Sequence, residues 1–341
     1  MTGPTTTVGS MAELHLSGPT SILVIEGLTL PQATDDHLAR IGAAAPDGST
    51  VTVATGMRDA VGKAAGTEVV LGFVNEPLLE AAPGLRWVHA IASGVDELLF
   101  PAFVASDVIL TGEKGLVGGH LADTGFGLLL ALTRQIAAAL RAGPAAWEHR
   151  LEMRRAAVEL EGMTMGVVGF GGTGRAMARR AVAFGMDVIA VDEVPGEPSD
   201  GVAEVWPADR LDELVATSDV VAVCCPLTDT TRTLFDAGRL ARMRQGAYLV
   251  NVTRGEIVDL DDLVDALGAG HLAGAALDVV AGEPLAIDHP IFALENVAMT
   301  PHTAGASQLR ADRNVDRFCD NLRRAHKGEP LVGVVDKVAG Y

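Results

Sequence analysis

The chain alternates short apolar runs with longer amphipathic segments from its beginning to its end. In the first third, apolar runs predict strands at residues 22–25, 51–53, 69–71 and 87–90. Helical periodicity fills the gaps, most clearly at 35–44. Strands that alternate with helices at this spacing predict an α/β fold with parallel sheets.

A second and more regular series follows a long helical pattern that runs from Gly119 to Ala142, where Gly143-Pro144 would stop it. The predicted strands of this series cover residues 165–169, 187–191, 220–224, 247–252 and 274–277. Nearly continuous Val-rich runs are typical of strands in a sheet that is covered on both faces.

Two lobes account for this order. We expect residues 21–115 and 116–305 to form two Rossmann-like or flavodoxin-like lobes with parallel sheets and a cleft between them. Residues 1–20 are rich in Thr, Gly, Ser and Pro and predict a flexible tail. Residues 306–341, with a helix expected at 307–327, are too short to stand alone and would complete the first lobe.

The charge balance excludes several classes of partner. Lys and Arg number 26 against 44 Asp and Glu, for a net charge of −18. An acidic chain without a basic block is a poor partner for nucleic acid or an anionic membrane. The most apolar segment, residues 126–132, is far too short to span a bilayer, and no secretory signal is visible, so we expect a cytoplasmic protein.

The three cysteines do not predict a metal site or a disulfide framework. Cys224 and Cys225 are adjacent within an apolar run, and Cys319 lies far away in the sequence. None has the spacing of a metal ligand. We interpret the adjacent pair as buried strand residues, with a redox pair as the alternative.

A dinucleotide-binding turn is predicted where the strand at 165–169 runs into G-x-G-x-x-G. Gly169 would allow the tight turn, Gly171 would let the backbone approach a pyrophosphate, and Gly174 would let the next helix pack close to the strand. The helix expected at 175–184 would then point its first free N–H groups at the phosphates.

Asp192 ends the next predicted strand, 18 residues after Gly174. At this interval a carboxylate can accept hydrogen bonds from the ribose hydroxyls of the adenosine and repel a 2′-phosphate. Glu193 adds to that repulsion, and residues 192–200 contain no Arg or Lys. We therefore predict NAD rather than NADP as the cofactor; the alternative is that Asp192 only closes a turn.

Three charged residues follow predicted strands of the second lobe. Arg254 and Glu283 each stand shortly after such a strand, and His302, in Thr300-Pro301-His302, closes the lobe. Ligands of open α/β sheets bind beyond the carboxyl ends of the strands. We therefore expect these three side chains to converge near the nicotinamide.

With these motifs in place, the sequence resembles the D-isomer-specific 2-hydroxyacid dehydrogenase family over residues 21–325. The segments that carry the likeness are the glycine loop, Pro226-Leu227-Thr228 with Thr231, Asn251–Gly255, Ala276–Pro284, Pro301-His302 and Ala92-Ser93-Gly94-Val95-Asp96. Asp123 departs from the pattern, because the family commonly has Glu there, and Gly172 and Thr173 stand where larger residues are frequent.

The resemblance implies a catalytic role for three residues. His302 would be the acid/base, and Glu283 would hydrogen-bond to it and favour its protonated form. Arg254 would hold the substrate carboxylate with its planar guanidinium. The backbone N–H groups of Ser93 and Gly94 would bind the same carboxylate from the first lobe.

The resemblance also implies how the cofactor is held and how the chain assembles. Asp278 would face the nicotinamide carboxamide. The remaining positions expected to line NAD are Gly169, Gly171, Gly172, Thr173, Gly174, Asp192, Pro226, Val252, Ala304 and Gly305. The long helix at 119–142 would contribute to a homodimer.

These expectations define the predicted function and its alternatives. We predict hydride transfer between NAD(H) and a 2-hydroxy acid/2-oxo acid pair of D configuration, as in a glyoxylate/hydroxypyruvate reductase or a phosphoglycerate dehydrogenase. The alternative is a non-catalytic NAD-binding partner protein similar to the corepressors of this fold. Another Rossmann enzyme, such as a methyltransferase, would leave Arg254, Glu283 and His302 unexplained.

Overall fold

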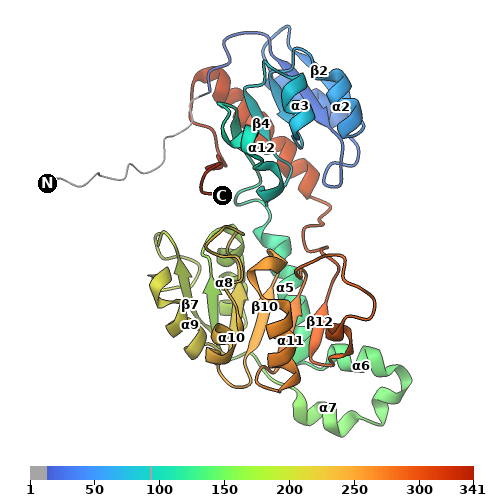
Figure 1. Cartoon of the computed structure of the whole chain (residues 1–341), viewed down its shortest axis with the longest axis vertical. Helices are drawn as coiled ribbons and strands as arrows, with labels where there is room; N and C mark the ends of the chain where they lie inside the picture. Colours follow the sequence, from blue (N-terminus) through green and yellow to red (C-terminus); the bar gives the residue numbers. More distant parts are fainter. Residues whose placement is uncertain (1–13, 93) are drawn as a thin grey trace, which may run out of the picture. The chain divides into compact units, whose positions relative to one another are not determined.

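The computed structural model describes residues 14–92 and 94–341. The chain forms two compact units (Figure 1). Unit 1 holds the chain up to Leu116 together with Ser307–Tyr341, and unit 2 holds Val117–Ala306. Each unit contains one parallel sheet, which confirms the predicted α/β class with two parallel sheets.

Unit 1 has a five-stranded sheet in the order β2-β1-β3-β4-β5, and every pairing is parallel. This is the flavodoxin-like order. The strands are β1 (Ser21–Ile25), β2 (Thr50–Ala54), β3 (Val69–Leu71), β4 (Trp87–His89) and β5 (Ile109–Thr111). The sequence pattern predicted the first four and missed β5.

Helices cover this sheet, and the last one returns from the far end of the chain. They are α1 (Asp35–Ala44), α2 (Met57–Lys63), α3 (Glu76–Ala81), α4 (Pro101–Val104) and α12 (Arg310–Lys327), with a short 3-10 helix at Asp96–Leu98. The predicted bounds of α1 are confirmed, whereas α12 begins at Arg310 rather than Ser307.

The prediction of a loose tail over residues 1–20 is wrong from Leu14 onward, and residues 1–13 lie outside the described part of the chain. Leu14 and Leu16 are buried in the core of unit 1. The Leu16 N–H donates to the Ala325 carbonyl at 3.0 Å, and the Leu16 carbonyl accepts from His326 Nδ1 at 2.5 Å. The segment from Leu14 therefore packs on α12; its two leucines, spaced by two residues, were the missed signal.

Unit 2 has a seven-stranded parallel sheet in the order β12-β11-β10-β9-β6-β7-β8. The strands are β6 (Thr164–Val168), β7 (Asp187–Asp192), β8 (Val205–Pro207), β9 (Val220–Val223), β10 (Tyr248–Asn251), β11 (Gly274–Leu277) and β12 (Val297–Met299). The order reverses between β6 and β9, as in Rossmann folds. The short strands β8 and β12 were missed.

Most helices of unit 2 flank this sheet, whereas α6 (Ile136–Ala142) and α7 (Arg150–Ala156) lie in an arm that projects from it (Figure 1). The flanking helices are α5 (Gly118–Thr133), α8 (Gly172–Ala183), α9 (Leu211–Thr217), α10 (Ala237–Arg242) and α11 (Leu260–Gly268). Short 3-10 helices lie at Gly143–Trp147, Ala208–Arg210, Gly255–Ile257 and Pro290–Ala293.

The single helix predicted from Gly119 to Ala142 is wrong, because the chain breaks it into α5 and α6. Gln135 adopts a left-handed backbone with φ of 61°. Arg134 donates to the Val158 carbonyl at 3.1 Å, and the Gln135 amide reaches the carbonyls of Leu132 and Ala156. Contacts with a segment over twenty residues away fix the break, so local periodicity does not reveal it.

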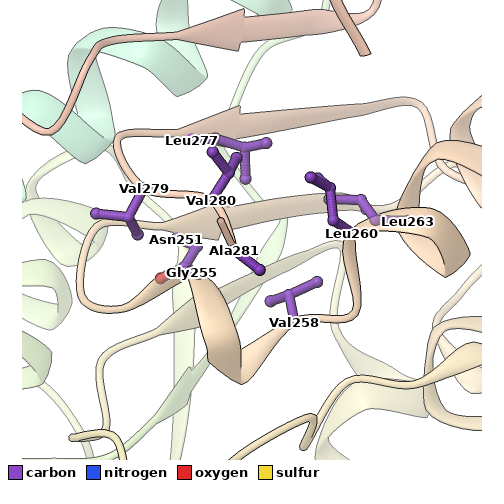
Figure 2. A pocket seen from close by; sticks show the side chains of 9 residues that line it. All are labelled: Asn251, Gly255, Val258, Leu260, Leu263, Leu277, Val279, Val280 and Ala281. Carbon is purple, nitrogen blue, oxygen red and sulfur yellow. The ribbon is translucent and has the colours of Figure 1, made fainter. Parts of the chain in front are cut away.

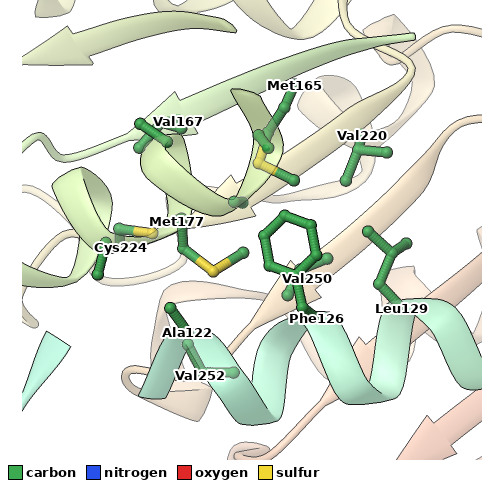
Figure 3. Close-up of a cluster of buried hydrophobic side chains, with 14 of the residues drawn as sticks. Ala122, Phe126, Leu129, Met165, Val167, Met177, Val220, Cys224, Val250 and Val252 are labelled. Carbon is green, nitrogen blue, oxygen red and sulfur yellow. The ribbon is translucent and has the colours of Figure 1, made fainter. Parts of the chain in front are cut away.

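Unit 2 has a hydrophobic cluster on each face of its sheet, and one of them lies between α5, α8 and the sheet (Figure 3). Phe126 and Leu129 of α5 are buried against Met177 of α8 and Val250 of β10. Gly125 lets α5 approach closely, because an added Cβ would lie 3.3 Å from Val250 and 3.4 Å from Met177. This packing fixes α8, and with it the turn that precedes α8, on the sheet.

Candidate active site

The glycine turn lies between β6 and α8, at the carboxyl end of β6. Gly169 has φ of +92°, and a Cβ there would sit 2.6 Å from the Cys225 backbone. A Cβ on Gly174 would lie 2.1 Å from the Gly169 carbonyl oxygen. Only glycine fits either position, because one needs a left-handed backbone and the other a close approach of helix and strand.

The N-terminus of α8 offers a fitting place for a pyrophosphate. Gly171 is exposed, and a Cβ on it would meet no atom within 4 Å. No side chain of the described residues caps this helix start. Gly172 and Thr173 are half-buried in its first turn. Open space beside uncapped N–H groups is what an anionic dinucleotide bridge requires.

Asp192 ends β7 and points back to the glycine turn. Its Oδ2 accepts from the Phe170 N–H at 2.6 Å, and its Oδ1 accepts from the Val194 N–H at 3.0 Å. Asp192 thus closes a turn, which is the alternative role that the sequence left open for it. Its side chain is half-buried beside the glycine loop. A carboxylate has further acceptor sites beyond these two bonds, so the ribose role stays a prediction.

Cys224 and Cys225 follow β9 beneath the glycine turn. Both thiols are free and buried. Burial raises the pKa of the Cys225 thiol to about 12, and it raises that of Cys224 as well. Protonated thiols are poor nucleophiles, which favours packing residues over a redox pair.

His302 and Glu283 form a direct pair. His302 Nδ1 lies 2.8 Å from Glu283 Oε2, and the two side chains are 50% and 32% exposed. Because an ionised carboxylate only accepts hydrogen bonds, Nδ1 carries the proton and Nε2 is the ring atom that can address a substrate. Glu283 Oε1 accepts from the Val280 N–H at 2.9 Å, which orients the carboxylate.

Asp278 anchors the loop that carries His302. Its carboxylate accepts from Thr300 Oγ1 at 2.6 Å and from the N–H groups of Thr303 and Ala304, both at 2.9 Å. The His302 N–H donates to the Asp278 carbonyl at 2.8 Å, and His302 has φ of 53°. The anchor holds His302 in a strained left-handed backbone. Asp278 is 2% exposed, and its predicted contact with the carboxamide stays a prediction.

Arg254 follows β10, the strand next to β11. Asn251, 1% exposed, organises this turn by accepting from Thr253 and donating its amide to the Arg254 carbonyl at 2.9 Å. Arg254 Nη1 donates to the Thr253 carbonyl at 3.0 Å. A Cβ on Gly255 would overlap the Val280 carbonyl group, so the Arg254 turn packs on the loop that leads to Glu283.

Behind these two loops the unit is solidly packed. A pocket of about 10 Å³ lies below the ends of β10 and β11 (Figure 2). Its lining is apolar except for Asn251 and consists of Asn251, Gly255, Val258, Leu260, Leu263, Leu277, Val279, Val280 and Ala281. This volume is about that of one water molecule, so a ligand has to bind beyond the strand ends.

The remaining residues predicted to line the cofactor or the substrate differ in their burial. Pro226 is exposed and its carbonyl accepts from Thr231 Oγ1 at 2.6 Å, whereas Val252 is buried under the Arg254 turn. Gly305 is half-buried directly after Ala304. Gly94 is half-buried in unit 1, and Ser93 lies outside the described residues.

Several polar groups around the site escaped the sequence reasoning. The Val280 and Phe170 N–H groups escaped because main-chain donors carry no sequence signal. Thr300 could have been found as a hydroxyl two residues before the histidine. Arg175 forms a cluster with Ser199 and Asp200 beside the glycine loop, although it precedes Ser199 by 24 residues.

Neither a metal-binding cluster nor a membrane-spanning helix is found among residues 14–92 and 94–341. This part of the chain contains no group of three or more His, Cys, Asp or Glu side chains placed to hold a metal ion. None of its helices combines the length and the apolar character of a membrane span.

Comparisons with known proteins agree with this geometry. The family model "D-isomer specific 2-hydroxyacid dehydrogenase, NAD binding domain" matches residues 126–304. A glyoxylate reductase of Korarchaeum cryptofilum is 35% identical over 75% of this chain and 77% of the relative. An (S)-sulfolactate dehydrogenase of Chromohalobacter salexigens is 36% identical over 74% of this chain and 81% of the relative.

Among solved structures, the fold is similar to a D-isomer specific 2-hydroxyacid dehydrogenase from Xanthobacter autotrophicus Py2, in complex with NADPH and MES. The TM-score is 0.77 at 28% identity, over 96% of this chain and all of that chain. The glycine turn, the His–Glu pair and these matches lead to one conclusion: the chain belongs to the D-isomer-specific 2-hydroxyacid dehydrogenase family and is an oxidoreductase with an NAD-type cofactor.

Proposed function

We propose that this enzyme reduces a small 2-oxo acid to its D-2-hydroxy acid, with His302 as proton donor. The observation that carries the proposal is the 2.8 Å contact between His302 Nδ1 and Glu283 Oε2. It lies at the carboxyl edge of the same sheet that bears the glycine turn. The relatives named glyoxylate reductase and (S)-sulfolactate dehydrogenase support a small 2-oxo acid as substrate.

The proton step follows from the tautomer of His302. A bound reduced nicotinamide would supply the hydride to C2 of the oxo acid. His302 Nε2 delivers the proton to the oxygen on C2, where negative charge develops as the carbonyl is reduced. Glu283 compensates the positive charge of the imidazolium and keeps the ring oriented through Nδ1–H. In the oxidation direction, His302 Nε2 accepts the proton of the C2 hydroxyl while the hydride leaves C2.

Arg254 is the proposed carboxylate ligand. Its turn is fixed by Asn251 and by the close packing of Gly255, so the guanidinium is presented at the sheet edge where a ligand binds. A guanidinium matches a carboxylate with two parallel hydrogen bonds. The N–H groups near Gly94 are proposed as second ligands, which gives unit 1 the role of the substrate-binding lobe.

The cofactor is proposed to lie along the α8 N-terminus. The N–H groups of Gly172 and Thr173 would face the pyrophosphate. Asp192 would accept from the ribose hydroxyls, and this carboxylate favours NADH over NADPH. Pro226, Val252, Ala304 and Gly305 are proposed to line the remainder, with Asp278 near the carboxamide.

A steady-state panel tests this function. Glyoxylate, hydroxypyruvate, phenylpyruvate and related 2-oxo acids are each combined with NADH and with NADPH. We expect oxidation of NADH with at least one small 2-oxo acid. Binding of NADH without turnover across the panel would favour the corepressor-like alternative, and better use of NADPH would remove the role given to Asp192.

A homodimer is proposed from the arm formed by α6, the 3-10 helix and α7, which projects from unit 2 (Figure 1). Leu140, Trp147 and Leu151 are 78%, 81% and 66% exposed, and the arm surrounds an apolar groove of about 540 Å³. Exposed apolar clusters of this kind mark protein contacts. Light scattering that showed a monomer at micromolar concentration would contradict the dimer.

The remaining proposals concern the surroundings of the enzyme. The three cysteines are free, buried thiols, which fits a reducing cytoplasm. The net charge of −18 disfavours nucleic acid or an anionic membrane as a partner.

A further inference from the structure

A cluster of charged side chains lies on the adenosine side of the glycine turn, and the chemistry described so far does not use it. It consists of Arg175 and Arg179 on α8 together with Ser199 and Asp200 from the loop after β7, and it is called here the Asp200 cluster. Residues 192–200 themselves contain no Arg or Lys. The fold supplies two cations to this loop from α8 instead.

Arg175 lies beside the residue that Asp192 binds. Its guanidinium carbon is 4.6 Å from the centre of the Phe170 ring. The N–H of the same Phe170 donates to Asp192 Oδ2 at 2.6 Å. Phe170 therefore has the proposed ribose carboxylate on its backbone and a guanidinium on its ring. NADPH differs from NADH only by a 2′-phosphate on this ribose, and a guanidinium is a good ligand for a phosphate.

Arg175 is already bound to the loop. Its Nη1 donates to Ser199 Oγ, its Nη2 lies 3.4 Å from the Glu197 carbonyl oxygen, and its Nη1 lies 3.8 Å from Asp200 Oδ2. Ser199 in turn donates to Asp200 Oδ2 at 2.6 Å. These contacts offset the charge of Arg175 and hold its guanidinium on the loop.

The surroundings of Asp200 stabilise its ionised carboxylate. Its side chain is 18% exposed, and Arg179 Nη1 donates to its Oδ1 at 2.8 Å. The hydrogen bond from Ser199 and the two neighbouring arginines lower the pKa of the Asp200 carboxyl. The carboxylate is therefore ionised at neutral pH and interacts with both guanidinium groups.

On this basis, which rests on the proposed function, we propose that Asp200 is a specificity-determining residue for the cofactor. It withholds Arg175 from the adenosine 2′ position, so the preference for NADH depends on Asp200 as well as on Asp192. Loss of the Asp200 charge would release a guanidinium on a flexible stem next to the place of a 2′-phosphate.

The test compares dissociation constants of NADH and NADPH by isothermal titration calorimetry, without substrate. Asp200→Asn is the main variant, because it removes only the charge, and Asn tolerates the left-handed backbone of this residue, with φ of 58°. We expect NADPH to bind about tenfold tighter, the effect of one exposed charge-assisted contact. NADH binding should change less than about twofold, since NADH carries no 2′-phosphate.

Three further variants separate this proposal from a change in the loop. Asp200→Asn combined with Arg175→Met should return NADPH binding to the native value. Arg179→Ala, the matched control that also removes a partner of Asp200, should not improve NADPH binding. Ser199→Ala frees one Arg175 bond without touching the strained residue and should give a smaller gain, about threefold.

The outcomes are distinct. Unchanged NADPH binding in both Asp200→Asn and Ser199→Ala, with NADH binding intact, would overturn the proposal. A gain that persisted after Arg175→Met would do the same, because the cation would then not be the cause. If the native protein bound neither dinucleotide, the proposed function itself would fail.

Discussion

Each unit of the molecule contains a glutamate that is paired with a basic side chain, and the two pairs differ in exposure. In unit 1 the Glu113 side chain is fully buried. Its carboxylate accepts hydrogen bonds from Arg310 Nε at 2.8 Å and from Arg310 Nη2 at 2.6 Å. In unit 2 the Glu283–His302 pair is one third to one half exposed. The buried pair connects Glu113, which lies shortly before the end of the first segment of unit 1, to Arg310 of α12. It therefore stabilises the packing of α12 within unit 1. The exposed pair is open to solvent, as its proposed role in proton transfer requires.

The histidines of the two units show the same contrast. His89 is completely buried, and burial lowers its pKa to about 3. Its Nδ1 contacts Thr111 Oγ1 at 2.7 Å, and the same oxygen accepts from Trp87 Nε1. Such an imidazole stays neutral at physiological pH. A histidine that transfers protons needs the exposure and the carboxylate partner that His302 has.

The largest effect on stability is expected from the buried pair. Glu113→Gln removes the carboxylate charge that Arg310 contacts in this buried setting, together with a carboxylate oxygen that also binds Asn314. The free energy of unfolding of unit 1 should fall by about 3–5 kcal/mol. Denaturant unfolding, monitored by hydrogen exchange of the amides of unit 1, measures this free energy. Asp59→Asn, which breaks the exposed pair with Lys63, is the control and should leave the midpoint unchanged.

The exposed pair should respond in turnover instead of stability. Glu283→Gln removes the charge that supports the imidazolium, so kcat should fall about 10–100-fold while NADH binding and the melting temperature stay near native values. Steady-state kinetics and calorimetry provide the readouts, with the exposed Glu159→Gln as control. A loss of stability equal to that of Glu113→Gln would erase the contrast between the two pairs.

His89 makes stability depend on pH. Its folded pKa of about 3 lies below the unfolded value of about 6.5, so the unfolded chain takes up a proton first as the pH falls. The contribution of His89 is present above about pH 6.5 and is lost progressively toward pH 3, by roughly 2 kcal/mol between pH 6.5 and 5. Melting curves over this range, compared with His89→Leu, test it; equal slopes would contradict the account.

The smallest expected effect tests the anchor of the His302 loop. Thr300→Val removes the 2.6 Å bond to Asp278 and preserves the shape of the side chain. One lost hydrogen bond corresponds to about 1 kcal/mol, so turnover should drop about fivefold. Thr303→Val is a matched control, because Thr303 contributes its backbone N–H to Asp278. Equal effects of the two variants would argue against a side-chain anchor.

The sequence predicted those elements whose signal is local. The five longer strands of unit 2 are nearly continuous apolar runs, and the glycine spacing located the turn between β6 and α8. The strands β5, β8 and β12 were missed, although β3 and β4 are equally short and were predicted. The break at Gln135 depends on hydrogen bonds to residues 156 and 158, which no local pattern encodes.

The site was predictable where chemistry requires a particular side chain. Glu283 and His302 were predicted to pair, and their hydrogen bond is present in the structure. The contacts of Asp278 with Thr300 and Ala304 and the approach of Arg175 to Ser199 depend on how loops cross in space. The absence of Arg and Lys from residues 192–200 therefore did not reveal the two arginines that reach this loop from α8.

The central claim, that His302 delivers the proton, is tested most directly by single-turnover hydride transfer in His302→Gln at saturating NADH and substrate. Glutamine retains a polar side chain but transfers no proton at neutral pH. We predict a transfer rate about 10²–10⁴-fold below native, with NADH affinity unchanged. A rate within about threefold of native would contradict the account, because general acid catalysis by His302 would then contribute almost nothing.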